Sequence, residues 1–326
     1  AATTGDVAAA ADVSQGYVYE VVGTLAGRDL VTIDESTSPT TIRAREPEEA
    51  IEGLTSRLSD LESAIESEYA GGAGRAEFEI VHSRPTVRRR ALSAIETATH
   101  EVFVIVPAPE FEHLADVLAD AVERGVFVYC LLLAPDAAET AAEIDDPGRY
   151  AHVLRTWETT PPVFVLADEC VGVMGSHAVL SGRHGDSYAL SFAQPEIASG
   201  FFGNLISNVW PMGETVFVAE PDPLPATYEH LRTAATNAAL HRAAGHDLLA
   251  DLVVEHTDSG ERESFEGVPI VDVRQSLVGE STADFPMENS LVFEFEGGRY
   301  SVGNRGGGID PFLEAFAAVE VTLREA

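Results

Sequence analysis

The side chains that could do chemistry here are ten histidines, two cysteines and many carboxylates, and their spacing matches no familiar metal or catalytic motif. His241 and His246 are five residues apart, which places them off a common helical face, and the other histidines are scattered. Cys130 and Cys170 lie in apolar, strand-like runs, so we expect buried thiols and no disulfide framework or paired-cysteine zinc site. The sequence also lacks a phosphate-binding glycine loop, a nucleophilic-serine elbow and the HExxH zinc motif. We therefore expect no metal site and no cofactor.

Charge is the most extreme property of the chain. It has 54 acidic and 20 basic side chains, a net charge of −34, and every basic residue is arginine. Such a surface suits a cytoplasm at multimolar salt, where charge repulsion is screened over roughly 3 Å. The composition therefore predicts a halophilic archaeal source, and it does not exclude a nucleic-acid partner. The densest cationic stretch is Arg88-Arg89-Arg90, which could bind phosphates or form a solvated helix face.

The length of 326 residues is enough for two or three domains, each able to bury a core. No apolar run approaches the length of a membrane span, and no signal peptide is recognisable. We therefore expect a cytosolic protein.

Residues 1–45 have the pattern of a small DNA-binding module. We expect Thr4 to cap a helix over 6–11 and Ser14 to cap a second helix over 15–26. Strands over 28–33 and 40–45 should follow, and this order predicts a winged helix-turn-helix whose second helix enters the major groove. The alternative is a small helical subdomain packed on another part of the chain. A helix that usually precedes such a pair is missing, so we expect the module to be truncated. The predicted contacts to double-stranded DNA are Ser14, Gln15, Gly16, Tyr17 and Tyr19 at the helix start, and Arg28, Arg43 and Arg45 near phosphates.

Residues 46–70 show the apolar spacing of a coiled coil. Apolar side chains recur at alternating intervals of three and four residues, whereas the positions between them are mostly polar. This pattern predicts a helix that forms a homodimer, and the alternative is an amphipathic helix lying on its own domain. The predicted dimerisation seam consists of Ile51, Leu54, Leu58, Leu61 and Ile65.

The rest of the chain predicts two kinds of domain. Residues 75–224 alternate apolar strands with amphipathic helices, which is typical of an α/β domain with a buried sheet. Residues 225–246 should form a connector helix, and residues 247–326 should be all-β. The expected fold class is therefore multidomain, α/β plus all-β.

The runs VSQGYVYEVVGTLAGRDLV and REPEEAIEGL resemble the archaeal TrmB-like, sugar-responsive transcription regulators. This resemblance implies a recognition helix, a wing and a dimerisation helix in the first 70 residues. The run EHLADVLADAVERGVFVYCLLL is similar to the phospholipase-D-like domain in the middle of these regulators.

Active phospholipase-D-like enzymes carry the motif H-x-K-x4-D-x6-G-S. Asp168 and Gly175-Ser176 keep the spacing of the last part, but Pro161 and Val163 stand where histidine and lysine are required. Without the histidine no phosphohistidine intermediate can form. We therefore expect this domain to carry no catalytic residues and the protein not to be an enzyme.

The last domain resembles the sugar-binding domain of TrmB-like proteins, whose pattern is V-G-G-x-G followed by an acidic pair. Val302, Gly303 and Gly306 match this pattern and Asp310 stands at the first acid, whereas Asn304 and Pro311 depart from it. Glycines allow the backbone to approach sugar hydroxyls, and a carboxylate accepts from them. The alternative is a flexible glycine hairpin without a ligand. The effector site implied by the resemblance consists of Ser301, Gly303, Asn304, Gly306, Gly307 and Asp310.

Together these features predict a DNA-binding regulator of sugar or central carbon genes. A small effector, a sugar or a sugar phosphate, should modulate its operator binding. The alternatives are a repressor that needs no effector and, less favoured by the motif, a phosphodiesterase-like enzyme.

Overall fold

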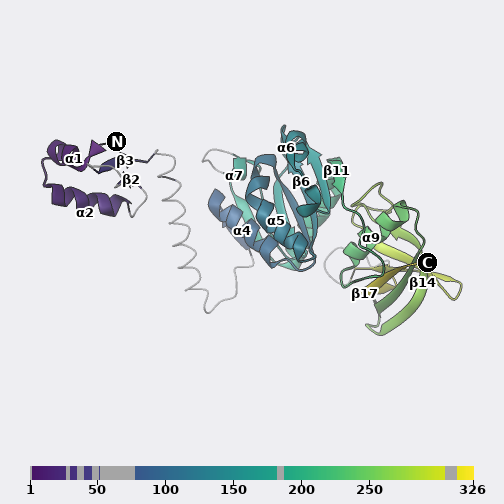
Figure 1. Cartoon of the computed structure of the whole chain (residues 1–326). Helices are drawn as coiled ribbons and strands as arrows, with labels where there is room; N and C mark the ends of the chain where they lie inside the picture. Colours follow the sequence, from purple (N-terminus) through teal and green to yellow (C-terminus); the bar gives the residue numbers. More distant parts are fainter. Residues whose placement is uncertain are drawn as a thin grey trace. The chain divides into compact units, whose positions relative to one another are not determined.

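The chain divides into two compact units, Ala1–Arg75 and Ala76–Ala326, in a computed structural model (Figure 1). The structure describes residues 2–26, 30–34, 40–45, 51, 78–181, 187–304 and 314–326. Each unit is considered below by itself.

The first unit joins two helices to a small antiparallel sheet. In chain order its elements are β1 (Ala2–Thr3), α1 (Thr4–Ala11), α2 (Gln15–Ala26), β2 (Val31–Asp34) and β3 (Thr41–Ala44), and the strand order is β1-β3-β2. Its core consists of Ala8, Val18, Val22 and Ile42. The helices and the two later strands follow in the predicted order, whereas β1 was not predicted.

The cap of the first helix differs from the prediction. Thr3, not Thr4, is the N-cap, because its hydroxyl accepts the backbone N–H of Asp6 while its own N–H donates to the Asp6 carboxylate. Thr4 is the first helical residue and is buried. Ser14 accepts the backbone N–H of Tyr17 at 3.3 Å, as expected of a residue before α2. The predicted dimerisation seam lies outside the described residues except for Ile51, which is helical and 55% exposed.

The second unit is built first on an eight-stranded mixed sheet with the order β11-β7-β6-β5-β8-β9-β10-β4. β5, β6 and β7 run parallel, and the strands outside them are antiparallel to their neighbours. Every residue of β5 and β6 is buried, because helices cover both faces of the sheet. The strands are β4 (Phe78–Val81), β5 (Glu101–Pro107), β6 (Phe127–Leu133), β7 (Val153–Trp157), β8 (Val163–Ala167), β9 (Val171–Gly175), β10 (Ala189–Ala193) and β11 (Glu214–Val218).

Alternate residues of β5 point to opposite faces of the sheet and enter two different cores. Val102, Val104 and Val106 pack with α4 (Arg84–Thr97) and α5 (Phe111–Glu123), whereas Phe103 and Ile105 pack with α8 (Pro195–Asn204). The short helices α6 (Ala137–Glu143) and α7 (Ala178–Ser181) complete the α4 side. Among the described residues, no helix combines the length and the apolar character needed to cross a membrane.

The sequence predicts one helix over residues 195–210, but the helix in the structure is not a continuous α-helix. The α-helix ends at Asn204 and continues as a π-helical turn, Leu205–Val209, and a 3-10 turn, Trp210–Met212. Pro211 has no N–H to donate to an α-helical carbonyl, which is consistent with the change of winding. Trp210 is buried between the sheet and a later loop, to which its ring nitrogen donates at Leu277 O.

A β-barrel follows the sheet. Strand β12 (Ala226–Tyr228) and helix α9 (Leu231–Ala243) precede β13 (Leu248–His256), β14 (Arg262–Arg274), β15 (Ser290–Phe295), β16 (Gly298–Gly303) and β17 (Phe316–Glu325). Val302 of β16 pairs in parallel with Phe316 of β17, and this pairing closes the five strands from β13 through β17 into a barrel. The prediction of one helix over 225–246 was wrong at its start, because residues 226–228 pair with β17 as a strand.

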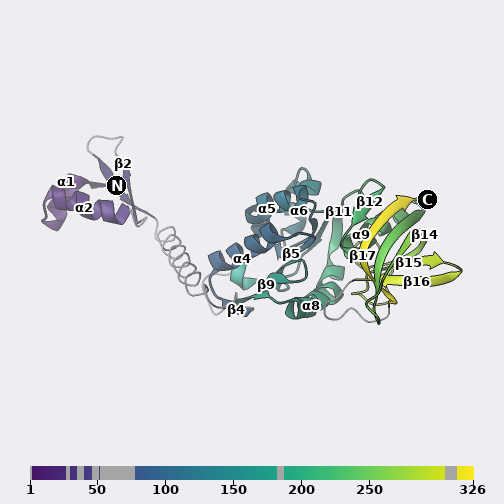
Figure 2. The same cartoon turned by 90° about the horizontal axis from the view of Figure 1, so that it is seen from below.

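Helix α9 lies between the sheet and the barrel in both views (Figures 1 and 2). Leu231, Ala234 and Ala238 enter the barrel core, whereas Leu240 packs against the core on the α8 side of the sheet. On the same helix, the Thr236 hydroxyl is 2.9 Å from the Tyr129 hydroxyl of β6. The helix therefore joins the two parts of the second unit.

Candidate functional site

A cleft of about 430 Å³ lies between the sheet and the barrel. Its lining is about half polar, with two carboxylates, two imidazoles and one amide, and an apolar strip from β17 contributes much of the rest. His100 directly precedes β5 of the sheet. The other groups come from the segment before α9, the residue directly after β16, and β17. The lining residues are His100, Glu229, His230, Asn304, Ala318, Val319 and Glu320.

Two imidazoles form one wall of this cleft. The rings of His100 and His230 are stacked, with centroids 5.5 Å apart and planes 9° from parallel. Burial lowers the pKa of His230 to about 3, and the charges of Arg232 and His100 add to this effect. His230 is therefore neutral at neutral pH, with one ring nitrogen able to donate and the other able to accept.

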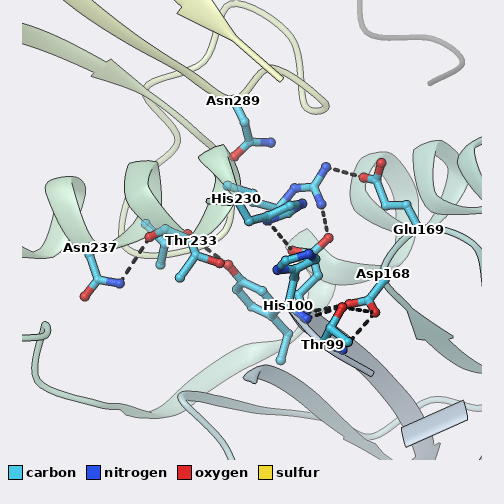
Figure 3. Close-up of polar contacts among 12 residues, drawn as sticks. Thr99, His100, Asp168, Glu169, His230, Thr233, Asn237 and Asn289 are labelled. Atoms are coloured by element: carbon cyan, nitrogen blue, oxygen red, sulfur yellow. Dashed lines mark hydrogen bonds and ion pairs between the residues drawn. The ribbon is translucent and has the colours of Figure 1, made fainter. Parts of the chain in front are cut away.

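A buried cluster of charges lies beside this wall (Figure 3). Arg232, in the first turn of α9, forms ion pairs with Glu101 at the start of β5 and with Glu169 in the β8–β9 turn. Its guanidinium also lies over the ring of Phe202, 4.3 Å from the centroid. Burial raises the pKa of Glu101, and the charge of Arg232 offsets part of that rise. Glu101 also reaches the wall, because its second oxygen is 3.9 Å from Nδ1 of His230.

Asp168 holds the strand on which His100 lies. Its carboxylate accepts the backbone N–H groups of Thr99, His100 and Glu101 at 2.8 to 3.0 Å, and the Thr99 hydroxyl at 2.9 Å. Burial alone would raise the pKa of Asp168, but these hydrogen bonds outweigh it and lower the pKa below its usual value. Asp168, the aspartate of the H-x-K-x4-D pattern, thus fixes the backbone from Thr99 to Glu101.

The remaining positions of that pattern serve packing. Val163, where the enzymes have lysine, begins β8 and is buried in the core on the α4 side, and Pro161 offers no side-chain donor. A Cβ on Gly175 would lie 2.8 Å from the Cβ of Ala189, so the glycine allows β9 and β10 to approach.

The predicted DNA contacts are placed in the first unit. Tyr17 and Tyr19 are 55% and 54% exposed on α2, because Val18 and Val22 take the buried face of the helix. Ser14, Gln15 and Gly16 are also exposed at its start, Arg43 is exposed on β3, Arg45 directly follows β3, and Arg28 lies outside the described residues.

The predicted effector residues are only partly described. Asn304 lines the cleft, and Gly303 precedes it at the end of β16, where a Cβ would lie 2.9 Å from the Glu314 carboxyl carbon. Ser301 is half-buried on β16, whereas Gly306, Gly307 and Asp310 lie outside the described residues. Sequence reasoning missed His100, Glu229, His230 and Glu320, which no local motif marks.

Other candidate groups are engaged or buried. Arg88 forms a two-bond ion pair with Glu110, both bonds 2.7 Å, and Arg90 pairs with Glu79 at 2.7 Å. Burial raises the pKa of the Cys130 thiol, whereas Cys170 is only half-buried and lies in the turn before β9, not in a strand as expected. In the described part of the chain, no three His, Cys, Asp or Glu side chains are placed to hold a metal ion.

Two protein-family models match the second unit. Residues 77–217 match the N-terminal subdomain of the effector-binding domain (EBD) of the transcriptional regulator TrmB, and residues 223–326 match the C-terminal subdomain of the TrmB/TrmBL1 EBD. The junction falls between β11 and β12, so the cleft lies between the two subdomains. No curated protein sequence matches the chain.

Solved structures with a similar arrangement are distant. One is TrmBL2, an archaeal chromatin protein with a novel mode of DNA binding; it is 15% identical, covers 66% of this chain and 88% of its own, and has a TM-score of 0.36. Another is Nuc of Salmonella typhimurium, a phospholipase D family member, with 19% identity, coverage of 44% and 98%, and a TM-score of 0.33. NucT of Helicobacter pylori has 14% identity, coverage of 39% and 92%, and a TM-score of 0.29.

The neutral, buried state of His230 predicts an acid-sensitive fold. Between pH 6.5 and about 3 the unfolded histidine binds a proton that the folded one excludes, so its contribution to stability is lost as the pH falls. One such proton changes the unfolding free energy by about 1.4 kcal/mol per pH unit.

We expect His230→Gln to remove this pH-dependent loss of stability. The difference in unfolding free energy between wild type and variant should therefore change between pH 6.5 and about 3. Denaturant unfolding at constant salt measures it, with the exposed His113→Gln as control. Parallel pH curves for wild type and His230→Gln would contradict the prediction.

Proposed function

The chain belongs to the TrmB-like family of archaeal transcriptional regulators, and we propose that a small neutral sugar or polyol in the cleft modulates its binding to operator DNA. The observation that carries the proposal is the polar cleft between the two effector-domain subdomains, lined by groups from both. A ligand that contacts both walls binds one arrangement of sheet and barrel better than others. That difference in affinity is what allosteric control requires, typically about 1–3 kcal/mol. The regulated genes would be those of sugar or central carbon metabolism.

The lining of the cleft favours an uncharged, hydroxylated ligand over a sugar phosphate. Glu229 and Glu320 would repel a phosphate, and the nearby Arg232 is already bound by two carboxylates. Carboxylates accept hydrogen bonds from hydroxyl pairs, and the Asn304 amide and a neutral imidazole can both donate and accept. Glucose and short glucosides have this chemistry.

Residues 2–45 support the proposal of a winged helix-turn-helix DNA reader. Two helices followed by an antiparallel strand pair match the order of elements in that motif, and β1 adds a third strand. The exposed Tyr17 and Tyr19 would face bases or sugars in the major groove, with Arg43 near phosphates. At multimolar salt the electrostatic share of affinity is small, so these direct contacts would dominate.

We further propose a homodimer through the seam from Ile51 to Ile65, in the cytoplasm of a salt-rich archaeal cell. The alternating spacing of three and four residues and the Lys-free, acidic composition support this. The main alternative is a repressor that needs no effector, which leaves the polar lining of the cleft unexplained. A phosphodiesterase is less favoured, because Pro161 and Val163 cannot act as nucleophile or cation.

The ligand proposal predicts binding of a neutral sugar in preference to its phosphate. In calorimetry at multimolar KCl, we expect glucose or maltose to bind and glucose 6-phosphate to bind at least about tenfold more weakly, a difference of 1.4 kcal/mol. Glu320→Gln should reduce the difference in affinity between the neutral sugar and its phosphate. Asn304→Ala should weaken binding of the neutral sugar by about 1 kcal/mol, because one hydrogen bond is lost. Glu266→Gln, exposed on β14, is the control. No heat with any neutral sugar, in a protein that still binds DNA, would favour the effector-independent alternative.

The DNA reader predicts a specific loss at α2. We expect Tyr17→Ala to weaken operator binding about tenfold, because a base contact contributes about 1–3 kcal/mol. Electrophoretic shift at high salt with fragments from genomic mapping measures this. Tyr188→Ala, a tyrosine 51% exposed in the second unit, is the matched control. Equal affinities for wild type and Tyr17→Ala would remove α2 as the reader.

If the seam forms the dimer interface, acidic side chains introduced into it should dissociate the dimer. Leu54→Asp with Leu58→Asp should give monomers, because two carboxylates per chain would enter an apolar interface, and operator binding should fall with dimerisation. Light scattering measures the mass. Ser56→Asp with Ser59→Asp adds the same charge outside the seam and should leave the dimer intact. A dimer that survives the leucine substitutions would assign the interface elsewhere.

A further inference from the structure

We propose that Asp168 and Glu169 are positioning residues of the ligand cleft, each fixing one of the two stacked imidazoles. They are adjacent in the β8–β9 turn, and neither lines the cleft itself. Figure 3 shows both carboxylates on the side of the turn that faces His100 and His230. The inference rests on the proposed ligand cleft.

Asp168 acts on His100 through the backbone. Its two carboxylate oxygens bind three consecutive N–H groups, from Thr99 to Glu101, and the N–H of Asp168 donates in return to Glu101 O at 3.0 Å. The peptide planes on both sides of His100 are therefore held. Because the direction of a side chain is set by its backbone, Asp168 fixes where the His100 ring leaves the sheet.

Glu169 acts on His230 through Arg232. The guanidinium uses one terminal nitrogen for Glu101 and the other for Glu169, which ties the first turn of α9 to the sheet and to the β8–β9 turn. His230 is the N-cap residue of α9, only two positions before Arg232. The ion pair therefore determines how far the His230 ring extends toward His100 across the junction of sheet and barrel.

The backbone of the β8–β9 turn has a conformation that residues with side chains rarely adopt. Asp168 and Glu169 have φ values of 50° and 49°, in the left-handed region that most residues with a side chain disfavour. Glycine would adopt this conformation without strain, but it would supply no carboxylate. The strain is offset by the hydrogen bonds of Asp168 and the ion pair of Glu169, so turn shape and cleft wall depend on the same contacts.

The cluster is also a poor choice if stability were its only role. Glu101 and Arg232 are removed from water and Glu169 is largely so, and such groups can often be replaced by apolar residues without loss of stability. What an apolar substitute cannot supply is a fixed angle and distance between two ring-bearing segments. We therefore expect substitution of Asp168 or Glu169 to disturb the His100–His230 pair. Loss of another contact between the two subdomains should disturb that pair less.

A second buried arginine offers the matched control. Arg155 of β7 also ties the sheet to the barrel subdomain, by donating to Leu277 O at 3.1 Å. Within the sheet subdomain it donates to Trp210 O at 2.8 Å, and its guanidinium lies over the Trp210 ring. It is no part of the cleft lining. A substitution of Arg155 therefore loosens the same two subdomains at a different place.

The test follows the two imidazoles by NMR in the full chain with labelled histidine, assigned through His100→Gln and His230→Gln. Each variant releases one of the two ring-bearing segments, so we expect Asp168→Asn to move the His100 signals most and Glu169→Gln to move the His230 signals most. Both should weaken glucose or maltose binding about tenfold. Arg155→Gln should lower the melting temperature while leaving both sets of signals in place.

Three outcomes would overturn the inference: unmoved signals in both carboxylate variants, equal movement in Arg155→Gln, or unchanged sugar affinity despite moved signals. If Asp168→Asn fails to fold, Glu169→Gln alone decides, because that side chain is partly exposed. The NMR result does not depend on a ligand. If wild type binds no sugar while the signals move as expected, the proposed function fails and the positioning of the imidazoles stands.

Discussion

The second unit depends on one buried guanidinium held between two carboxylates. Arg232 belongs to the helix that packs into the barrel, and Glu101 and Glu169 belong to the sheet and one of its turns. In an interior of low polarity each of these charges would be costly alone, and breaking a buried pair typically costs about 3–5 kcal/mol. The three groups therefore restrict the barrel to the arrangement in which all are paired. The cleft is the space that this arrangement leaves open beside the pair.

The scarcity of cations makes this use of arginine informative. Only 20 basic side chains face 54 acidic ones, yet Arg155 and Arg232 are both buried at the junction of sheet and barrel. Arginine suits this position better than lysine, because its planar fork can bind two oxygens in fixed directions and stack on an aromatic ring. Both residues do so, on Trp210 and Phe202. In a chain dominated by acidic residues, these two buried cations therefore fix geometry between the sheet and the barrel.

Much of the fold follows from local sequence, and the cleft does not. The largely apolar runs over 101–107 and 163–167 predict strands, and β5 and β8 have these bounds. β4, β7 and β12 were missed: they are short, carry polar residues such as Glu79, Arg155 and Thr227, and become strands by pairing with a partner distant in sequence. His100 and His230 are 130 positions apart and meet only through tertiary packing. Of the predicted effector residues, Asn304 lines the cleft, and most of the glycine cluster lies outside the described residues.

The sheet also constrains how a ligand could act on the rest of the chain. Residues before Phe78 enter the second unit at β4, and β4 connects through β10 and β9 to the turn that carries Asp168 and Glu169 by unbroken antiparallel ladders. Domain switching commonly uses a junction between packed parts that can adopt two arrangements, and continuous hydrogen-bonded ladders favour a rigid sheet. In the second unit such a junction is that of sheet and barrel, where the cleft lies. The proposed ligand effect on the proposed DNA reader would therefore begin as a change in that junction.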